Sequence, residues 1–261
     1  MAAKRIIWVL AAWIVILAPG QAAPIAPVPV PAKRFLLERL PGHDAVFLGT
    51  RHRRPRLLAF VGDLVATLSR TGLTHVALEI ASDQQPALDR FMAGRGRLSE
   101  IRIDPNIDCA AYRALLERIR AAGVGALAMD LPQDRWSAAQ GRDRWMARRL
   151  AGLFARSAGT RVLVVAGNLH ALKRIQWLAP SLETGGIRHH LSIRRPDLRL
   201  LSVAQSIGQR PGQCPYADRF AGASAPVAVI TGPASPPPGF VRLAAAAPMT
   251  GLEAVDAVIV Y

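Results

Sequence analysis

Two short turns carry the residues best suited to chemistry. Gly49–His52 and Gly167–His170 share the pattern Gly-x-x-His, and each follows a short apolar run. Glycine permits a sharp bend after a strand because it has no Cβ atom. Histidine ionises near neutral pH, so each imidazole could serve as a general base, a nucleophile or a metal ligand.

A carboxylate and an arginine extend this set. Glu79 interrupts the apolar run Val76–Ile80, and a buried carboxylate without a partner costs several kcal/mol, on the order of 2 to 7. A cation, a metal ion or a histidine is therefore expected beside it, and Arg142 is the preferred cation. A purely structural ion pair is the alternative. Asp130 ends another apolar run and could join the same site or cap the following turn.

The elements that must position these residues alternate between strands and helices. Buried strands are expected where aliphatic residues occupy both faces, and helices where apolar residues recur at helical spacing and a glycine follows. The predicted strands are 45–48, 75–80, 125–129 and 161–166, with later ones at 200–204, 227–230 and 257–261; the predicted helices are 56–70, 84–92, 108–122 and 137–157.

This alternation predicts an α/β fold, a single domain with a mostly parallel sheet and helices on both faces. Ligands of such sheets bind beyond the carboxyl ends of the strands. Four predicted strands deliver an ionisable residue to that rim, and Gly49, Gly167 and Asn168 complete it. The rim should therefore join the two histidines to Glu79 and Asp130.

The beginning of the chain indicates export. Lys4 and Arg5 precede thirteen apolar residues, 6–18, and small residues follow, which is typical of a secretory signal peptide and short of the ~20 residues that span a bilayer. We expect residues 1–23 to be a signal peptide, 24–34 a proline-rich linker and 35–261 the folded domain, located in the periplasm or outside the cell.

The net charge and the two cysteines limit the partners and sites that the chain is expected to have. The formal net charge is +15, which reflects either a drift in composition towards arginine or attraction to an anionic ligand or envelope surface. Export argues against nucleic acid as a partner. Cys109 and Cys214 permit one disulfide, and their spacing gives no zinc-thiolate motif. The sequence also lacks a serine-hydrolase elbow, a Walker loop and a dinucleotide fingerprint.

The ordered motifs resemble the superfamily that unites the Tiki/TraB metalloproteases, the erythromycin esterases and the ChaN-like haem-uptake proteins. The resemblance covers about half of the chain, from Ala45 to Leu172. Its motifs are Phe47–His52, Ala77–Ile80, Arg142–Ala147 and Val165–Ala171, and the segments Gln84–Gly94 and Tyr112–Leu116 look closest to the ChaN-like branch.

Each branch implies a different use of the site. The Tiki/TraB branch implies a divalent transition metal held by His52, Glu79 and His170 for cleavage of a peptide. The esterase branch implies that His52 is a base that activates water, with Glu79 in support. The ChaN-like branch implies haem binding, for which Tyr112 is a candidate axial ligand.

One departure affects the expected activity. Thr50 stands where the superfamily commonly has glutamate. The leading hypothesis is a hydrolase, acting on a small molecule or a peptide, in which the two histidines activate water or bind metal and Arg142 stabilises a carboxylate or an oxyanion. The alternatives are a haem-binding envelope protein involved in iron uptake and a member that keeps the fold without turnover.

Overall fold

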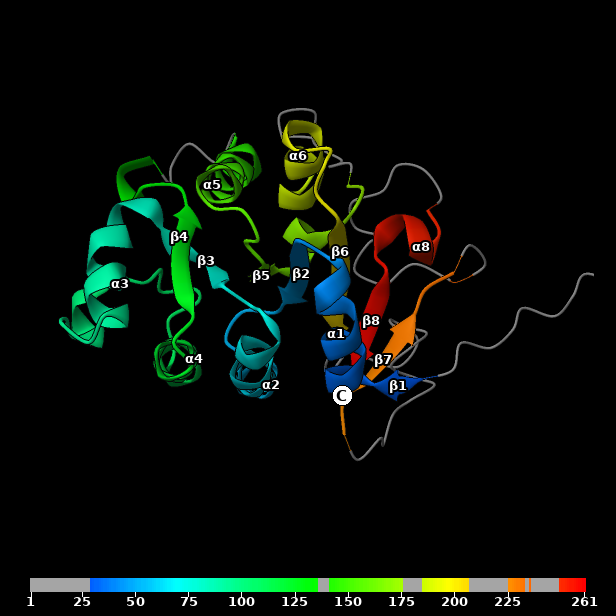
Figure 1. The fold of residues 1–261 in the computed structure, drawn as a ribbon, viewed down its shortest axis with the longest axis horizontal. Coiled ribbons are helices and arrows are strands. Elements are labelled where there is room, and N and C mark those ends of the chain that lie inside the picture. Colours follow the sequence, from blue (N-terminus) through cyan, green and yellow to red (C-terminus); the bar gives the residue numbers. More distant parts are fainter. Residues whose placement is uncertain (1–28, 136–140, 176–184, 207–224, 233–234, 236–248) are drawn as a thin grey trace, which may run out of the picture.

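One eight-stranded sheet organises the part of the chain that the computed structural model describes, namely residues 29–135, 141–175, 185–206, 225–232, 235 and 249–261. The strand order is β1-β7-β8-β6-β2-β5-β3-β4 (Figure 1). The strands are β1 (Val30–Pro31), β2 (Ala45–Thr50), β3 (His75–Ala81), β4 (Gly125–Asp130), β5 (Val162–Gly167), β6 (Leu200–Ser206), β7 (Val227–Ile230) and β8 (Ala257–Val260).

The sheet is mostly parallel. All pairings from β8 to β4 are parallel, whereas β7 runs antiparallel to both β8 and β1. The carboxyl ends of β2, β5, β3 and β4 therefore meet at one edge. The predicted fold class, a single α/β domain with helices on both faces, is confirmed.

Helices cover both faces of the sheet (Figure 1). On one face lie α1 (Ala32–Arg39), α2 (Pro55–Leu68) and α4 (Ala110–Ala121), and on the other lie α5 (Arg142–Arg156) and α6 (Ile187–Arg194). The helix α3 (Gln85–Met92) packs against β4, and the short helix α8 (Gly251–Ala254) directly precedes β8 in the chain.

Alternation along each strand explains the two-sided core. In β2, Val46 and Leu48 belong to the cluster that contains α2 and α4, whereas Ala45 and Phe47 belong to the cluster under α5. Successive strand residues point to opposite faces. A strand that is apolar on both faces is thus buried between two helical layers, as its composition indicated.

The predicted linker, residues 24–34, extends too far, because its last residues belong to the folded domain. Val30 and Pro31 form the edge strand β1, which pairs with β7, and α1 begins at Ala32, which is fully buried. Proline is tolerated on an edge strand because the missing N–H is not needed there. The fold therefore begins several residues before Phe35.

Several predictions lie outside the described residues: the signal peptide 1–23, the start of the helix predicted from Ser137, and Cys214 with its disulfide. The helix α6 was not predicted, since its sequence showed no regular pattern. It places His189 and His190 on a helix. Within the described ranges, no helix has the length and apolar character that a membrane span requires.

Candidate functional site

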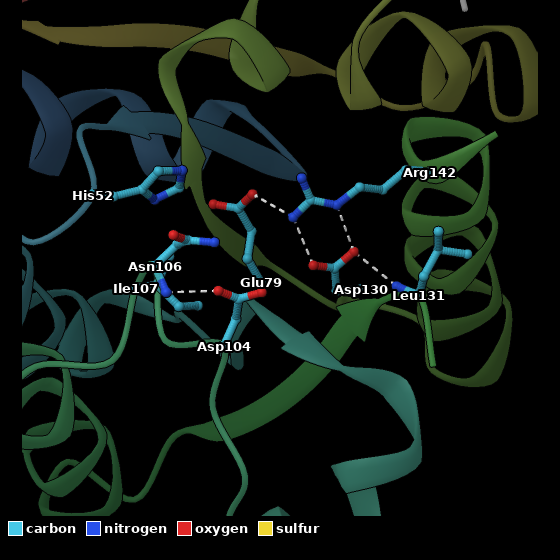
Figure 2. Close-up of a pocket in the computed structure, with 8 residues that line it drawn as sticks. All are labelled: His52, Glu79, Asp104, Asn106, Ile107, Asp130, Leu131 and Arg142. Carbon is cyan, nitrogen blue, oxygen red and sulfur yellow. Dashed lines mark hydrogen bonds and ion pairs between the residues drawn. The ribbon is translucent and has the colours of Figure 1, made fainter. Parts of the chain in front are cut away.

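The candidate site lies at the carboxyl ends of the four central strands. His52 follows β2 in a turn where Arg53 adopts a left-handed backbone (φ 54°). Such a φ is uncommon for a residue other than glycine. The turn leaves His52 exposed at the rim, and Figure 2 shows its ring directed towards the carboxylate of Glu79.

A bulge in β3 shapes the position of Glu79. Leu78 pairs with Ala128 and Ala81 pairs with Asp130, so two residues of β3 face one residue of β4. Bulges of this kind occur next to active sites, where they re-aim a side chain. Here the bulge contains Glu79 itself, the one carboxylate in β3 and close to the carboxyl end of the strand.

Two hydrogen-bond donors and a histidine surround the buried carboxylate of Glu79, which is 4 % exposed. The backbone N–H of Gly167 donates to Oε2 at 2.8 Å, and Nη2 of Arg142 donates to Oε1 at 3.2 Å. Nε2 of His170 lies 3.6 Å from Oε1. The expectation that Glu79 needs a cationic or histidine partner is met by both kinds of residue.

Arg142 links Glu79 to Asp130. Its Nε and Nη2 donate to the two oxygens of Asp130 at 2.8 and 2.7 Å, a bidentate pair (Figure 2). Burial alone would lower the pKa of Arg142, but Asp130 and Glu79 raise it above its ordinary value. Asp130 also accepts from the N–H of Leu131, so it joins the site and caps the turn at once.

Asp143, next to Arg142 at the start of α5, orients His170. Nδ1 of His170 lies 2.5 Å from Oδ1 of Asp143. Burial lowers the pKa of His170, but Asp143 and Glu79 outweigh burial and raise the pKa above its ordinary value. His170 is thus held between two carboxylates and favours its charged form.

The two histidines meet above Gly167. A Cβ atom placed on Gly167 would lie 3.4 Å from Cδ2 of His170 and 3.6 Å from both Nε2 and Cε1 of His52. Since the N–H of Gly167 binds Glu79, this glycine is the common neighbour of both imidazoles and the carboxylate. The predicted convergence of the two turns on one edge is observed.

A pocket of about 290 Å³ opens beside these residues. Its lining, drawn in Figure 2, is His52, Glu79, Asp104, Asn106, Ile107, Asp130, Leu131 and Arg142. This volume is at the lower end of small-molecule sites, roughly 300 to 1,000 Å³. The pocket can therefore hold a small group of a substrate next to His52 and Glu79.

Other predicted rim residues have structural contacts. The Asn168 side chain donates to the carbonyl of Gln205 and accepts from its N–H, so it faces β6 instead of the pocket. Gly49 lies against Asn168, because a Cβ atom there would be 2.4 Å from Oδ1 of Asn168. The hydroxyl of Thr50 donates to the carbonyl of Ala166.

The residues present do not fit a metal centre. Among the described side chains, no group of three or more His, Cys, Asp or Glu residues is arranged to hold a metal ion. Both oxygens of Asp130 and of Glu79 already accept hydrogen bonds, and Asp143 accepts one from His170. His52, Glu79 and His170 lie near one another at Gly167, but in the described part of the chain they are not arranged as a set of metal ligands.

Haem fits the pocket poorly as well. The pocket is small and lined with carboxylates, whereas a macrocycle needs broad apolar walls. The Tyr112 side chain is 5 % exposed, and its hydroxyl is buried. Tyr112 therefore cannot reach a haem iron in this conformation, which contradicts its candidacy as an axial ligand.

Sequence reasoning missed two parts of the site. Asp143 follows Arg142 directly in a motif already singled out, and an acidic residue in the first turn of a helix was the available signal. The loop with Asp104, Asn106 and Ile107 forms one wall of the pocket, and no periodic pattern marks it.

Comparison with known proteins agrees with this architecture. Residues 36–141 match the family described as "Haem-binding uptake, Tiki superfamily, ChaN", which confirms the resemblance found in the sequence. No curated protein matches the chain.

Three solved structures show the same fold at low identity. The cofacial haem complex of ChaN from Campylobacter jejuni has a TM-score of 0.54 at 16 % identity, covering 87 % of this chain and 91 % of that one. A variant of the erythromycin esterase EreC in its open conformation has a TM-score of 0.64 at 13 % identity, with 87 % and 92 % covered. A protein from Bacillus cereus has a TM-score of 0.58 at 12 % identity, with 87 % and 90 % covered.

Proposed function

We propose that this protein is a hydrolase that activates water for attack on an ester. The premise is that residues 36–141 carry the pattern of the ChaN family in the Tiki superfamily. The observation that carries the proposal is the meeting of His52, His170 and Glu79 at Gly167. A base, a fixed carboxylate and a histidine held between two carboxylates thereby lie near one pocket.

The proposed roles follow from the contacts. His52 is exposed at the pocket and takes a proton from water, whose oxygen forms the new bond to the carbonyl carbon. Glu79 is fixed by the Gly167 N–H and by Arg142, so it can orient that water and stabilise the imidazolium of His52. The imidazolium then returns the proton to the departing alcohol, and the C–O bond breaks.

His170 and Arg142 set the charge of the site. Both side chains lie against Glu79. Asp143 binds His170, and Asp130 binds Arg142. Arg142 and His170 thus hold the Glu79 carboxylate in place. Donors held in place before the reaction do not have to reorganise during it.

Hydrolysis of p-nitrophenyl acetate near neutral pH tests the proposal. We expect turnover by the wild type and a loss of about 10²- to 10⁴-fold in kcat for His52→Ala, the range of a lost general base. His43→Ala is the matched control, because the His43 ring binds the carbonyl of Arg39 and does not line the pocket. No turnover by the wild type, or equal turnover by His52→Ala, would contradict ester hydrolysis.

Haem binding is the second candidate, favoured by the description of the matched family. Since the pocket does not enclose a macrocycle, a haem would have to lie on the surface at the exposed His52. Addition of haem should then shift the Soret band for the wild type but not for His52→Ala. An unchanged spectrum of the wild type would exclude this candidate.

Export belongs to the proposal too. It rests on the charged and apolar pattern of residues 1–23, and it places the protein in the periplasm or outside the cell. N-terminal sequencing of the protein from a bacterial expression host should find a chain that begins near Ala23 or Pro24. A cytoplasmic chain that keeps Met1 would contradict it.

A further inference from the structure

The hydroxyl of Tyr112 is buried without a hydrogen-bond partner among the described residues. Tyr112 lies in the first turn of α4, directly after the loop that forms one wall of the pocket. An unsatisfied buried hydroxyl costs roughly 1 to 3 kcal/mol, and buried polar groups usually have a partner, often an ordered water molecule.

A small void lies beside Tyr112. It has a volume of about 10 Å³, and the residues that line it besides Tyr112 include Thr50, Arg51, Arg53, Leu58 and Val165. This is about the space of one water-sized probe, close to the minimum for a bound water. His52, Glu79 and Ile107 line both this void and the larger pocket, so its occupant would sit directly beside the reacting groups.

The charge around Tyr112 suits a hydrogen-bond donor. Burial raises the pKa of Tyr112 well above its ordinary value, and the negative charges of Glu79 and Asp130 raise it further. The phenol therefore keeps its proton at neutral pH. The lining of the void offers a water molecule a donor in Tyr112 and acceptors in Glu79 and His52, and buried water needs two to four such polar partners.

We propose that this void holds one water molecule, bound between the Tyr112 hydroxyl and the Glu79 carboxylate, and that Tyr112 is a positioning residue for the water that His52 activates. The assignment of the bound water to the reaction rests on the proposed hydrolase function. The water site itself rests on the unpaired hydroxyl and the void.

Tyr112→Phe tests the inference, because it removes the oxygen and keeps the ring in the core. We expect kcat for p-nitrophenyl acetate to fall about tenfold, the effect of one lost hydrogen bond of ~1.4 kcal/mol, with KM unchanged and the melting temperature not lowered. Ser202→Ala is the matched control. It removes another buried, unpaired hydroxyl, from β6 and outside both cavities, and it should leave kcat unchanged.

Crystal structures of the wild type and of Tyr112→Phe give a readout that does not depend on turnover. We expect an ordered water within hydrogen-bond distance of Tyr112 Oη and Glu79 in the wild type and its loss in the variant. A dry void in the wild type overturns the inference. Unchanged kcat in an active Tyr112→Phe enzyme overturns the positioning role alone, whereas an inactive wild type with the water in place overturns only the hydrolase.

Discussion

Removal of the Arg142 guanidinium should destabilise the fold. Arg142→Met leaves the carboxylates of Asp130 and Glu79, whose side chains are 3 % and 4 % exposed, without their shared cation. Breaking a buried ion pair on one side costs about 3 to 5 kcal/mol. Because the Arg142 side chain is itself 36 % exposed, solvent screens part of this, and about 3 kcal/mol is expected.

The assay is thermal and urea unfolding at neutral pH. A loss of ~3 kcal/mol should lower the melting temperature by about 6 to 12 °C in a chain of this size.

Arg102→Met is the control for this experiment. Arg102 pairs with Asp83 on the surface, where the side chains are 67 % and 35 % exposed, and exposed pairs contribute less than about 1 kcal/mol. A loss for Arg142→Met no larger than that of the control would refute the reasoning about the buried carboxylates.

Two further predictions concern the same edge of the sheet. The pKa of His170 is raised in the folded protein, so protonation of this residue stabilises the fold. This contribution is complete below the ordinary histidine pKa of ~6.5 and is lost as pH rises through the folded-state pKa. Urea unfolding should show that pH dependence in the wild type and a weaker one in His170→Asn. Gly49→Ala should lower the free energy of unfolding by about 1 to 3 kcal/mol, because the added Cβ would lie 2.9 Å from the backbone of Asn168. Gly167→Ala meets only ordinary contacts at 3.4 Å or more, so it should keep its stability while kcat falls. Equal stability of the two variants would contradict the packing argument.

The central strands could be predicted because each is apolar on both faces. Burial between two helical layers leaves this mark on the sequence directly, and the ionisable residue that ends each strand then falls at the shared edge. Glu79 is the clearest case, since a carboxylate in an apolar strand demands a partner. The pairing with Arg142 followed from that demand and from the motif match.

Contacts between distant elements could not be predicted in the same way. The depth of Tyr112 depends on how α4 packs against the sheet, and helical periodicity alone does not distinguish a core hydroxyl from one that reaches a ligand. The edge strand β1 was hidden because its prolines also suit an extended tether. Asp143 was overlooked because one acidic residue in an arginine-rich helix start is ordinary.

The position of β8 has a consequence for the order of folding. Residues 257–260 form the last of the described strands, yet they lie inside the sheet, between β6 and β7. β1 and β7 pair with each other although nearly the whole domain separates them in the sequence, and in the described sheet this pair reaches the parallel strands through β8. Pairings between such distant segments form slowly, so docking of the β1–β7 pair should be a late and separate phase of refolding.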